Sequence, residues 1–382
     1  LYGGTTSALG FKSEGTNFTG SLLIGHSTTG VISSAENNVG VGISALDALT
    51  SGDANVAIGN AAGSAITTGS ANILLGRAAG DALVEGSNNI AIGHFALSAE
   101  DGHGRNVGIG YAALNVQNAG ADAYNVAIGY DAGKSVSTGV QNTIIGGLAG
   151  DSLTTGSDNV AVGWAALSTE DGHGKNTAIG KGALNLLNAG SDAYNVAVGF
   201  NSGVAMTTGV RNTFIGGLSG DAATTGGDNV ALGYNALTSN TIGNSNIAIG
   251  KDAMITNVAA DRNVAVGLGA LQNMTSASTS DTYNVGVGYA AGQAITSGIY
   301  NNLLGGNAGS ALTSGTRNVA IGYDALSTED TGSHNVAIGH GSLKNADAGA
   351  DAYNVAVGSS AGNQVTTGTL NTIVGGLAGG AL

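Results

Sequence analysis

Residues 125–150 read NVAIGYDAGKSVSTGVQNTIIGGLAG, and residues 195–220, 70 positions later, read NVAVGFNSGVAMTTGVRNTFIGGLSG. Both stretches contain the motif Asn-x-x-aliphatic-Gly twice, and the chain of 382 residues contains it 20 times. Of the 19 intervals between these asparagines, 15 are 17 residues long, three are 19 and one is 21. Self-similarity at a fixed period indicates a repeat architecture, in which each unit buries its apolar surface against its neighbours.

We number each unit from its Asn. Position 2 is Val or Ile in 15 copies and Thr in four, position 4 is aliphatic in all copies, and position 5 is always Gly. Alternation over positions 2 to 4 is typical of a β-strand, and the glycine that follows indicates a turn. Units of 17 residues that are rich in Gly, Asn and β-branched residues are too short for helical repeats. The sequence therefore predicts an all-β fold: a parallel β-solenoid, or β-roll, of about 20 coils of 17 residues.

Coils stacked at about 4.8 Å would bring the asparagines together in one column. Amide side chains at that spacing can bond the layers above and below, so we expect a structural ladder that satisfies the turn backbone. The predicted ladder includes Asn55, Asn89, Asn125, Asn159, Asn195, Asn229, Asn263, Asn318 and Asn354. The predicted turn glycines include Gly59, Gly93, Gly129, Gly163, Gly199 and Gly233.

The alternation also raises the question of which side of the strand is buried. Positions 2 and 4 share one side, and we expect that side to face the core. Position 3 is usually Ala or Gly, but Ile144, Phe214, Leu303 and Ile373 are bulky, and position 6 is Gly in the same coils; Leu74 with Arg77 is the exception. We therefore expect positions 3 and 6 to share one space outside the core. Position 12 is usually aliphatic where position 9 is Gly, which indicates compensating volumes in one continuous core.

Aromatic residues recur at position 6, where we expect them to lie off the core face. An apolar stripe repeated in successive coils would aggregate if it stayed exposed, and closed cyclic association would hide it. We therefore expect the chain to associate with itself in a closed cyclic assembly. The candidate interface comprises Tyr111, Tyr130, Trp164, Phe200, Tyr234, Tyr289 and Tyr323.

Residues 1–20 do not follow the repeat, and we expect an atypical N-terminal segment or cap there. The string SLLIG at Ser21–Gly25 is a degenerate copy in register with Asn38, so we expect one continuous solenoid over residues 21–382. Within it, four coils form a superrepeat of 70 residues, and the longer coils end in Asp-Ala-Tyr or Asp-Thr-Tyr. Since the repeat runs to the last residue, we expect the sequence to be a fragment of a longer protein.

Composition disfavours several functional classes. The 11 basic and 25 acidic residues give a net charge of −14, which argues against a nucleic-acid partner because phosphates need clustered Lys and Arg. No run of about 18 apolar residues is present, so we expect no membrane insertion. The chain has no cysteine, so disulfides and thiolate metal sites are excluded.

Strings that resemble catalytic or ligand motifs coincide with the repeat. Gly358, Ser360 and Gly362 match GxSxG, but they occupy positions 5 to 9, where no strand-to-helix turn is expected. The EDGHG loops at residues 100–104 and 170–174 place carboxylates beside a histidine. We interpret them as solvated turns, with cation binding by three chains together as the alternative. We predict no catalytic, cofactor-binding or metal-binding residue and no enzyme activity.

Units such as NVAIG followed by x-x-Ala-Gly or x-x-Ala-Leu resemble the repeats of trimeric autotransporter adhesin heads, which are left-handed parallel β-rolls associated in threes. The 17-residue spacing with TTG turns is similar to shaft repeats of bacteriophage tail fibres. The resemblance covers residues 21–382. It implies an extracellular homotrimer, either a tail-fibre shaft or an adhesin head.

The leading functional hypothesis is a structural fibre shaft of a bacteriophage tail fibre that presents host-receptor-binding regions during attachment. Its partners would be copies of itself, other virion or cell-surface components, and a host receptor or glycan. The alternative is a bacterial cell-surface trimeric adhesin head. A polysaccharide-acting β-solenoid enzyme is the second alternative, but such enzymes need carboxylates that break the repeat in a groove.

Overall fold

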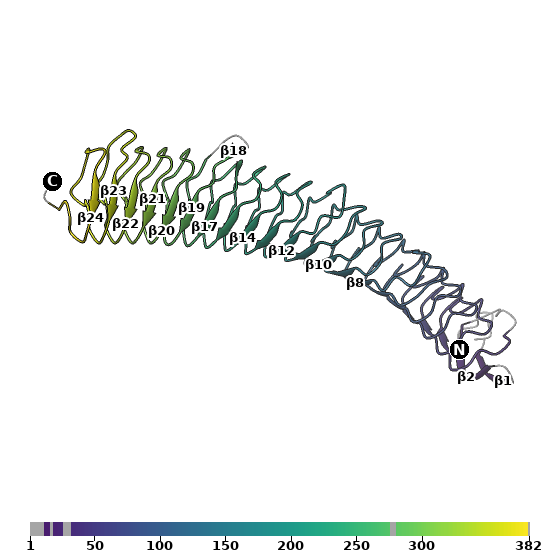
Figure 1. The fold of residues 1–382 in the computed structure, drawn as a ribbon. Helices are drawn as coiled ribbons and strands as arrows, with labels where there is room; N and C mark the ends of the chain where they lie inside the picture. Colours follow the sequence, from purple (N-terminus) through teal and green to yellow (C-terminus); the bar gives the residue numbers. More distant parts are fainter. Residues whose placement is uncertain (1–10, 16–17, 26–31, 276–279, 381–382) are drawn as a thin grey trace, which may run out of the picture. The chain divides into compact units, whose positions relative to one another are not determined.

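A computed structural model describes residues 11–15, 18–25, 32–275 and 280–380. Within these residues the backbone forms short strands and turns and no helix. The chain divides into two compact units, residues 1–192 and 193–382, and within each unit the coils are stacked in chain order (Figure 1). The predicted fold class is confirmed as an all-β parallel β-solenoid of about 20 turns with a spacing of about 17 residues.

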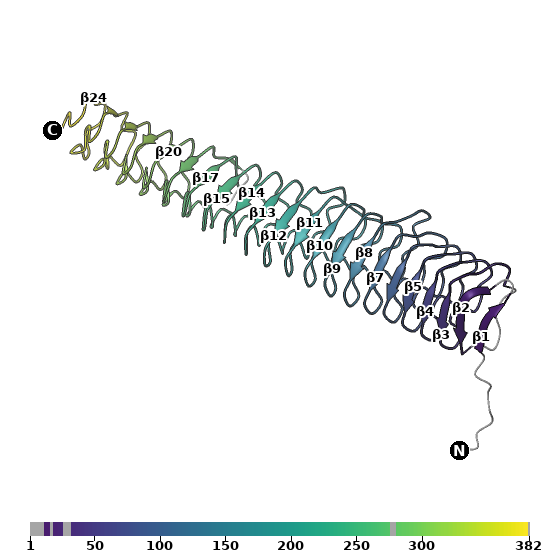
Figure 2. The same ribbon diagram turned by 90° about the horizontal axis from the view of Figure 1, so that it is seen from below.

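In the first unit, a hairpin precedes the coils (Figure 2). Strand β1 (Phe11–Gly15) pairs antiparallel with β2 (Phe18–Ile24), and β2 pairs parallel with β3, placing Leu22 opposite Val39. The degenerate copy at Ser21–Gly25 is therefore in register with the first full coil, as predicted. The following strands pair in parallel with their chain neighbours and cover positions 2 to 4 of each coil. They are β3 (Val39–Val41), β4 (Val56–Ile58), β5 (Ile73–Leu75), β6 (Ile90–Ile92), β7 (Val107–Ile109), β8 (Val126–Ile128), β9 (Thr143–Ile145), β10 (Val160–Val162) and β11 (Thr177–Ile179).

The second unit repeats this arrangement, and each position 2 pairs with the position 2 of the next coil. Its coil strands are β12 (Val196–Val198), β13 (Thr213–Ile215), β14 (Val230–Leu232), β15 (Ile247–Ile249), β17 (Val264–Val266), β19 (Val285–Val287), β20 (Asn302–Leu304), β21 (Val319–Ile321), β22 (Val336–Ile338), β23 (Val355–Val357) and β24 (Thr372–Val374). Two further strands, β16 (Ala260–Asp261) and β18 (Ser280–Asp281), pair in parallel beside the longest coil.

The side of the strand that faces the core is the opposite of the one predicted. In β4, Ala57 at position 3 is completely buried, whereas Ile58 at position 4 is 41% exposed. The same pattern, with only position 3 fully buried, holds in the other three-residue strands. The interior of a 17-residue coil is narrow and is filled by larger side chains from positions 9 and 12. In most coils the strand can therefore contribute only Ala or Gly inside, and its β-branched residues point outward.

The predicted competition between positions 3 and 6 is also wrong, since position 3 competes with position 9. A Cβ on Gly63 would lie 2.6 Å from Cδ1 of Leu74, and a Cβ on Gly220 would lie 2.6 Å from Cε2 of Phe214. Coils with a bulky position 3 therefore need glycine at position 9, because both side chains occupy the same interior space. Where position 9 is Gly, position 12 supplies buried volume, as at Ile66.

Position 8 is almost always Ala because it packs against the core side of the strands. Three coils have Ser there, and its hydroxyl is buried. In two of them it donates a hydrogen bond of 3.0 Å to a position-3 carbonyl, from Ser202 to Phe214 and from Ser342 to Ala356. The substitution is tolerated because the buried hydroxyl has an acceptor.

Candidate interaction surface

The residues at positions 2 and 4 form an exposed sheet surface, which we call the outer face. Position 2 is half-buried or exposed, and position 4 reaches 41% exposure at Leu232 and 69% at Val374 in the last described coil. Every position-4 residue is Val, Ile or Leu, and none of the 36 charged residues occupies position 2 or 4. Single exposed apolar residues are ordinary, but a stripe that continues through successive coils is typical of an interaction surface.

Aromatic side chains border the outer face at position 6. The seven candidate interface residues are between 42% exposed, at Tyr111, and 61% exposed, at Tyr289. Tyr111 and Tyr130 stack with their ring centroids 5.1 Å apart, and the Nζ of Lys181 lies 5.3 Å from the ring centroid of Trp164. Phe200, Tyr234, Tyr289 and Tyr323 belong to the second unit, where Tyr323 stacks on His340 at 5.7 Å.

The other border of the outer face is formed by the residue that precedes each ladder Asn. Tyr283 and Tyr300 are such residues, and their rings stack with centroids 5.6 Å apart. Together with Val285 and Asn302 they line a shallow hollow of about 420 Å³. Stacked aromatic rings with an amide in the same hollow make this part of the surface able to take both apolar and hydrogen-bonding groups.

The nine predicted ladder asparagines are all buried. Their geometry differs from a pure amide ladder. The Oδ1 of Asn55 accepts a hydrogen bond from the backbone N–H of Asn72 at 3.1 Å, and the Nδ2 of Asn55 donates to the carbonyl of Gly69 at 2.9 Å. A side-chain bond from Asn72 Nδ2 to Asn55 Oδ1, at 3.0 Å, accompanies this rung and several others. Each side chain thus joins its own turn to the backbone of the next coil.

The predicted turn glycines have φ between 133° and 145°, a region that L side chains rarely adopt. They also touch the next coil. A Cβ on Gly59 would lie 2.3 Å from the carbonyl oxygen of Gly76, and a Cβ on Gly129 would lie 2.5 Å from that of Gly146. Both the conformation and the close approach require glycine.

A cation–carboxylate–tyrosine contact holds the insert of the first 19-residue coil. The guanidinium of Arg105 pairs with Asp122, donates to the hydroxyl of Tyr124 at 2.6 Å, and has its central carbon 5.4 Å from the centroid of that ring. Asp122 also accepts a hydrogen bond from the backbone N–H of Gly104 at 3.1 Å. These contacts fix the C-terminal end of a loop whose Gly120 has no neighbour within 4 Å of a built Cβ.

The same arrangement recurs at the other long coils and was missed by the sequence analysis. Arg262 pairs with Asp281, which accepts a hydrogen bond from the hydroxyl of Tyr283 at 3.0 Å. His334 stacks on Tyr353, with centroids 4.6 Å apart. The signal was present in the sequence, because a basic residue precedes the Asn that opens every long coil. These residues are Arg105, Lys175, Arg262 and His334.

The interpretation of the EDGHG loops as solvated turns is wrong for their glutamates. Glu100 and Glu170 are completely buried at position 12, and so is Glu329 in the related loop TEDTGSH at residues 328–334. The two oxygens of Glu170 accept hydrogen bonds from the backbone N–H groups of His173, at 3.2 Å, and Ala189, at 3.4 Å. Ala189 belongs to the insert of the next coil, so the buried carboxylate joins that insert to the core.

Burial raises the pKa of all three carboxyl groups. For Glu100 the loss of solvation is the largest cause, and the charges of Asp101 and Asp122 add to it, which raises the pKa to about 7. Glu100 Oε2 has no hydrogen-bond partner among the described residues. The first EDGHG loop therefore contains a carboxylate whose ionisation is costly.

Replacing Glu100 with Gln is expected to change how stability depends on pH. Because the pKa is raised from 4.5 to about 7 in the folded chain, its stabilising contribution is complete below pH 4.5 and is lost as pH rises through 7. Glu100→Gln should therefore be more stable than the unchanged protein at pH 8, by up to about 3 kcal/mol, with little or no gain at pH 5. Urea denaturation at both pH values measures this difference.

The matched control is Asp101→Asn, which removes an exposed carboxylate from the same loop. It should leave most of the pH dependence in place. Equal stability of Glu100→Gln and the unchanged protein at pH 8 would contradict a costly ionisation at this site.

The same loops contain groups able to ligate a cation. Glu100, Asp101 and His103 place one ligand atom each within 4.8 Å of one another, as do residues 170, 171 and 173 and residues 329, 330 and 347. In the second and third groups both glutamate oxygens already accept backbone N–H groups. Their observed contacts attach the inserts, and three ligands are fewer than the six or more oxygens that Ca²⁺ takes.

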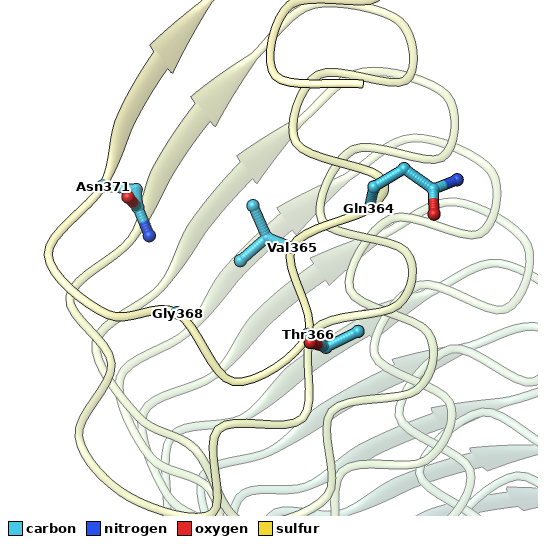
Figure 3. A pocket seen from close by; sticks show the side chains of 5 residues that line it. All are labelled: Gln364, Val365, Thr366, Gly368 and Asn371. Atoms are coloured by element: carbon cyan, nitrogen blue, oxygen red, sulfur yellow. The ribbon is translucent and has the colours of Figure 1, made fainter. Parts of the chain in front are cut away.

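A second hollow, of about 210 Å³, lies at the last described coil and is shown in Figure 3. Val365 and Asn371 point into the coil, whereas Gln364 points away from it. Their counterparts in the first unit, Leu153 and Asn159, are completely covered by the next coil. The hollow is thus the coil interior seen from the end of the described stack.

Compared with known proteins, the chain matches no family model, no curated protein and no solved structure. In the described part of the chain there is also no helix long and apolar enough to span a membrane.

Proposed function

We propose that the chain is a structural shaft, that three copies associate through their outer faces, and that the assembly belongs to a bacteriophage tail fibre. In this role it is extracellular, as part of a virion, and holds host-receptor-binding regions away from the particle. Its partners are copies of itself, other virion components, and a receptor or glycan on the host. It performs no catalysis.

The observation that carries the proposal is the uncharged, aliphatic outer face. A coil contributes about 4.8 Å of height, and positions 2 to 6 span roughly 13 Å, which gives about 60 Å² per coil. The 20 coils supply about 1,200 Å² per chain, more than the roughly 800 Å² per partner of a standard stable interface. The area suffices for lasting self-association, and the resemblance of the repeats to trimeric fibres supports three copies.

The interior supports a mechanical role. Each coil is joined to the next by strand pairing, by an Asn side chain and by turn-to-turn bonds such as Thr67 N–H to Val84 O at 3.0 Å. Stability of such a stack is a sum of coil and nearest-neighbour contributions, so every added coil extends the shaft without a new core. Several fibres acting together would raise avidity without a strong single site.

A bacterial cell-surface trimeric adhesin head would use the same fold and the same outer face. Neighbouring sequence separates the two, since a C-terminal membrane β-barrel belongs to an adhesin and a virion-attachment or chaperone domain to a tail fibre. A polysaccharide-acting enzyme is the remaining alternative. Cleavage of a bacterial glycan by this chain would favour it.

Charge placed on the outer face is expected to separate the copies. The unchanged protein should have the mass of three chains by light scattering. The double variant Ile58→Lys/Ile321→Lys should have the mass of one chain with the same β-sheet circular dichroism, because two lysines on each copy would have to be buried.

The control pair is Thr68→Lys/Ser314→Lys, which adds the same charge at exposed turns away from the outer face. It should keep the mass of three chains. If the unchanged protein is itself monomeric at micromolar concentration, the proposed function is wrong.

A further inference from the structure

The outer face poses a problem of alignment. Since 15 of the 20 coils present aliphatic residues at both positions 2 and 4, two copies shifted by one coil, about 4.8 Å, would still bury most of this apolar surface. Strands whose faces are uniform specify their register weakly. Something other than the aliphatic residues has to distinguish the aligned arrangement from the shifted ones.

Five coils differ at position 2, where a polar residue replaces Val or Ile. Within the described part of the chain, none of the five side chains makes a hydrogen bond or a ring contact of its own. Each takes a place on the outer face that Val or Ile occupies in the other coils. The five residues are Thr143, Thr177, Thr213, Asn302 and Thr372.

Four of these coils also carry Gly at position 6, so the aromatic border is interrupted beside the polar group. At Gly217 the ring of Tyr234 from the next coil lies 3.6 Å from a built Cβ, and at Gly306 the ring of Tyr323 lies 3.1 Å from one. Asn302, one of the five, also lines the hollow formed with Tyr283 and Tyr300 at the other border of the outer face. The polar coils thus differ from the others in shape as well as in chemistry.

We propose that the five polar residues at position 2 set the register in which copies of this chain align. This inference rests on the proposed self-association. The polar residues occupy the seventh, ninth, eleventh, sixteenth and twentieth coils, and this spacing is irregular. In aligned copies each of the five polar groups lies opposite the same residue of the other copy. Thr can then hydrogen-bond Thr, and Asn can hydrogen-bond Asn.

A shift changes these pairings. After a displacement by one or by three coils, no polar group faces a polar group of the other copy. After any other displacement, at most two of the five polar groups of a copy do so. The remaining groups would face Val or Ile and lose their hydrogen bonds to water, which opposes the shifted arrangement. Thr143 and Thr213 are four coils apart, as are Asn302 and Thr372, but Thr213 and Asn302 are five coils apart. A shift by one four-coil superrepeat therefore cannot pair all of these residues. A polar residue in an apolar helical seam sets register in coiled coils by the same physics.

Thiol cross-linking tests the register, because the chain has no cysteine. One population carries Ile321→Cys and a second carries Val357→Cys, at position 4 of coils two apart, about 9.6 Å in height. The two are refolded together and oxidised. Disulfides need Cα atoms within about 7 Å, so aligned copies should join like with like at least about tenfold more often than unlike.

The comparison is made in two backgrounds. In the first, all five polar residues are replaced by valine, which suits a strand, and the excess of like over unlike cross-links should fall to about twofold or less. The second is a control that removes five hydroxyl groups from turns away from the outer face and should keep the tenfold excess. Its substitutions are Thr67→Val, Thr154→Val, Thr207→Val, Thr241→Val and Thr313→Val.

The outcomes separate the two proposals. An undiminished excess in the first background, with the mass of three chains retained, would overturn the assignment of register to these residues and leave self-association intact. A one-chain mass in the unchanged protein without cross-links of either kind would overturn self-association, and the register proposal with it.

Discussion

Asn55→Ala is expected to lower the free energy of unfolding of the surrounding coils by about 3–5 kcal/mol. The substitution leaves the carbonyl of Gly69 and the backbone N–H of Asn72 without their partners, and a buried group left unpaired costs about 1–3 kcal/mol. The lost amide also leaves a small cavity. Because each coil contacts only its neighbours, the loss should be local, and hydrogen exchange at Asn72 and Ile73 measures it.

Asn60→Ala is the matched control. Asn60 lies in the same coil, but its side chain is exposed and makes one weak hydrogen bond, of 3.4 Å, to the carbonyl of Ile43. Its replacement should change stability by less than about 0.5 kcal/mol. Equal protection at Asn72 in both variants would contradict a structural role for the asparagine column.

Gly59→Ala is expected to be at least as damaging, with a loss of about 3–5 kcal/mol. The residue has φ 141°, and the added Cβ would lie 2.3 Å from the carbonyl oxygen of Gly76. Backbone strain of this kind costs about 1–3 kcal/mol, and overpacking adds about 1–3 kcal/mol. The coils would have to separate at this corner, and denaturant titration of the first unit measures the loss.

Alanine substitutions at two other glycines separate the cost of backbone strain from the cost of close contact with the next coil. Gly102 has an ordinary φ and no neighbour within 4 Å of a built Cβ, so Gly102→Ala should be close to neutral. Gly120 has φ 69° with the same open surroundings, so Gly120→Ala should show strain alone, about 1 kcal/mol. If Gly59→Ala is no worse than Gly120→Ala, close contact between coils is not what requires glycine.

The fold class follows from the sequence because the repeat is simple. Twenty copies of Asn-x-x-aliphatic-Gly, most of them 17 residues apart, fix the coil length, the strand position and the turn. The degenerate copy at Ser21–Gly25 could also be aligned, and β2 pairs with β3 in that register. Parallel, in-register stacking needs no information beyond the period itself.

The choice of the buried side could not be made from alternation. Alternation shows that Val56 and Ile58 share a side, but not whether that side faces the core. The larger size of the residues at positions 2 and 4 suggested that they face the core. This was misleading, because the interior of a coil is already filled from positions 9 and 12, as by Leu46 and Ile66. A better guide was the exchange of volume between positions 3 and 9, illustrated by Phe214 opposite Gly220.

The backbone conformation at the corners of the coils and the contacts that hold the inserts depend on interactions that the period of the sequence does not reveal. Leu46 and Ala54 adopt left-handed backbone, with φ 56° and 57°, which their residue types disfavour in isolation. Stacking against the next coil maintains these conformations. The buried position of Glu170 likewise follows from the insert of the next coil, whose Ala189 it binds.

Cryo-electron microscopy of the unchanged protein in solution would show where the outer face lies. We expect three chains per particle, with the exposed sides of β3–β15, β17 and β19–β24 turned toward a common axis and with density joining Thr143 or Asn302 to its counterparts. Particles of one chain, or three chains that leave Ile58 and Leu232 in solvent and meet through their turns, would contradict the proposal.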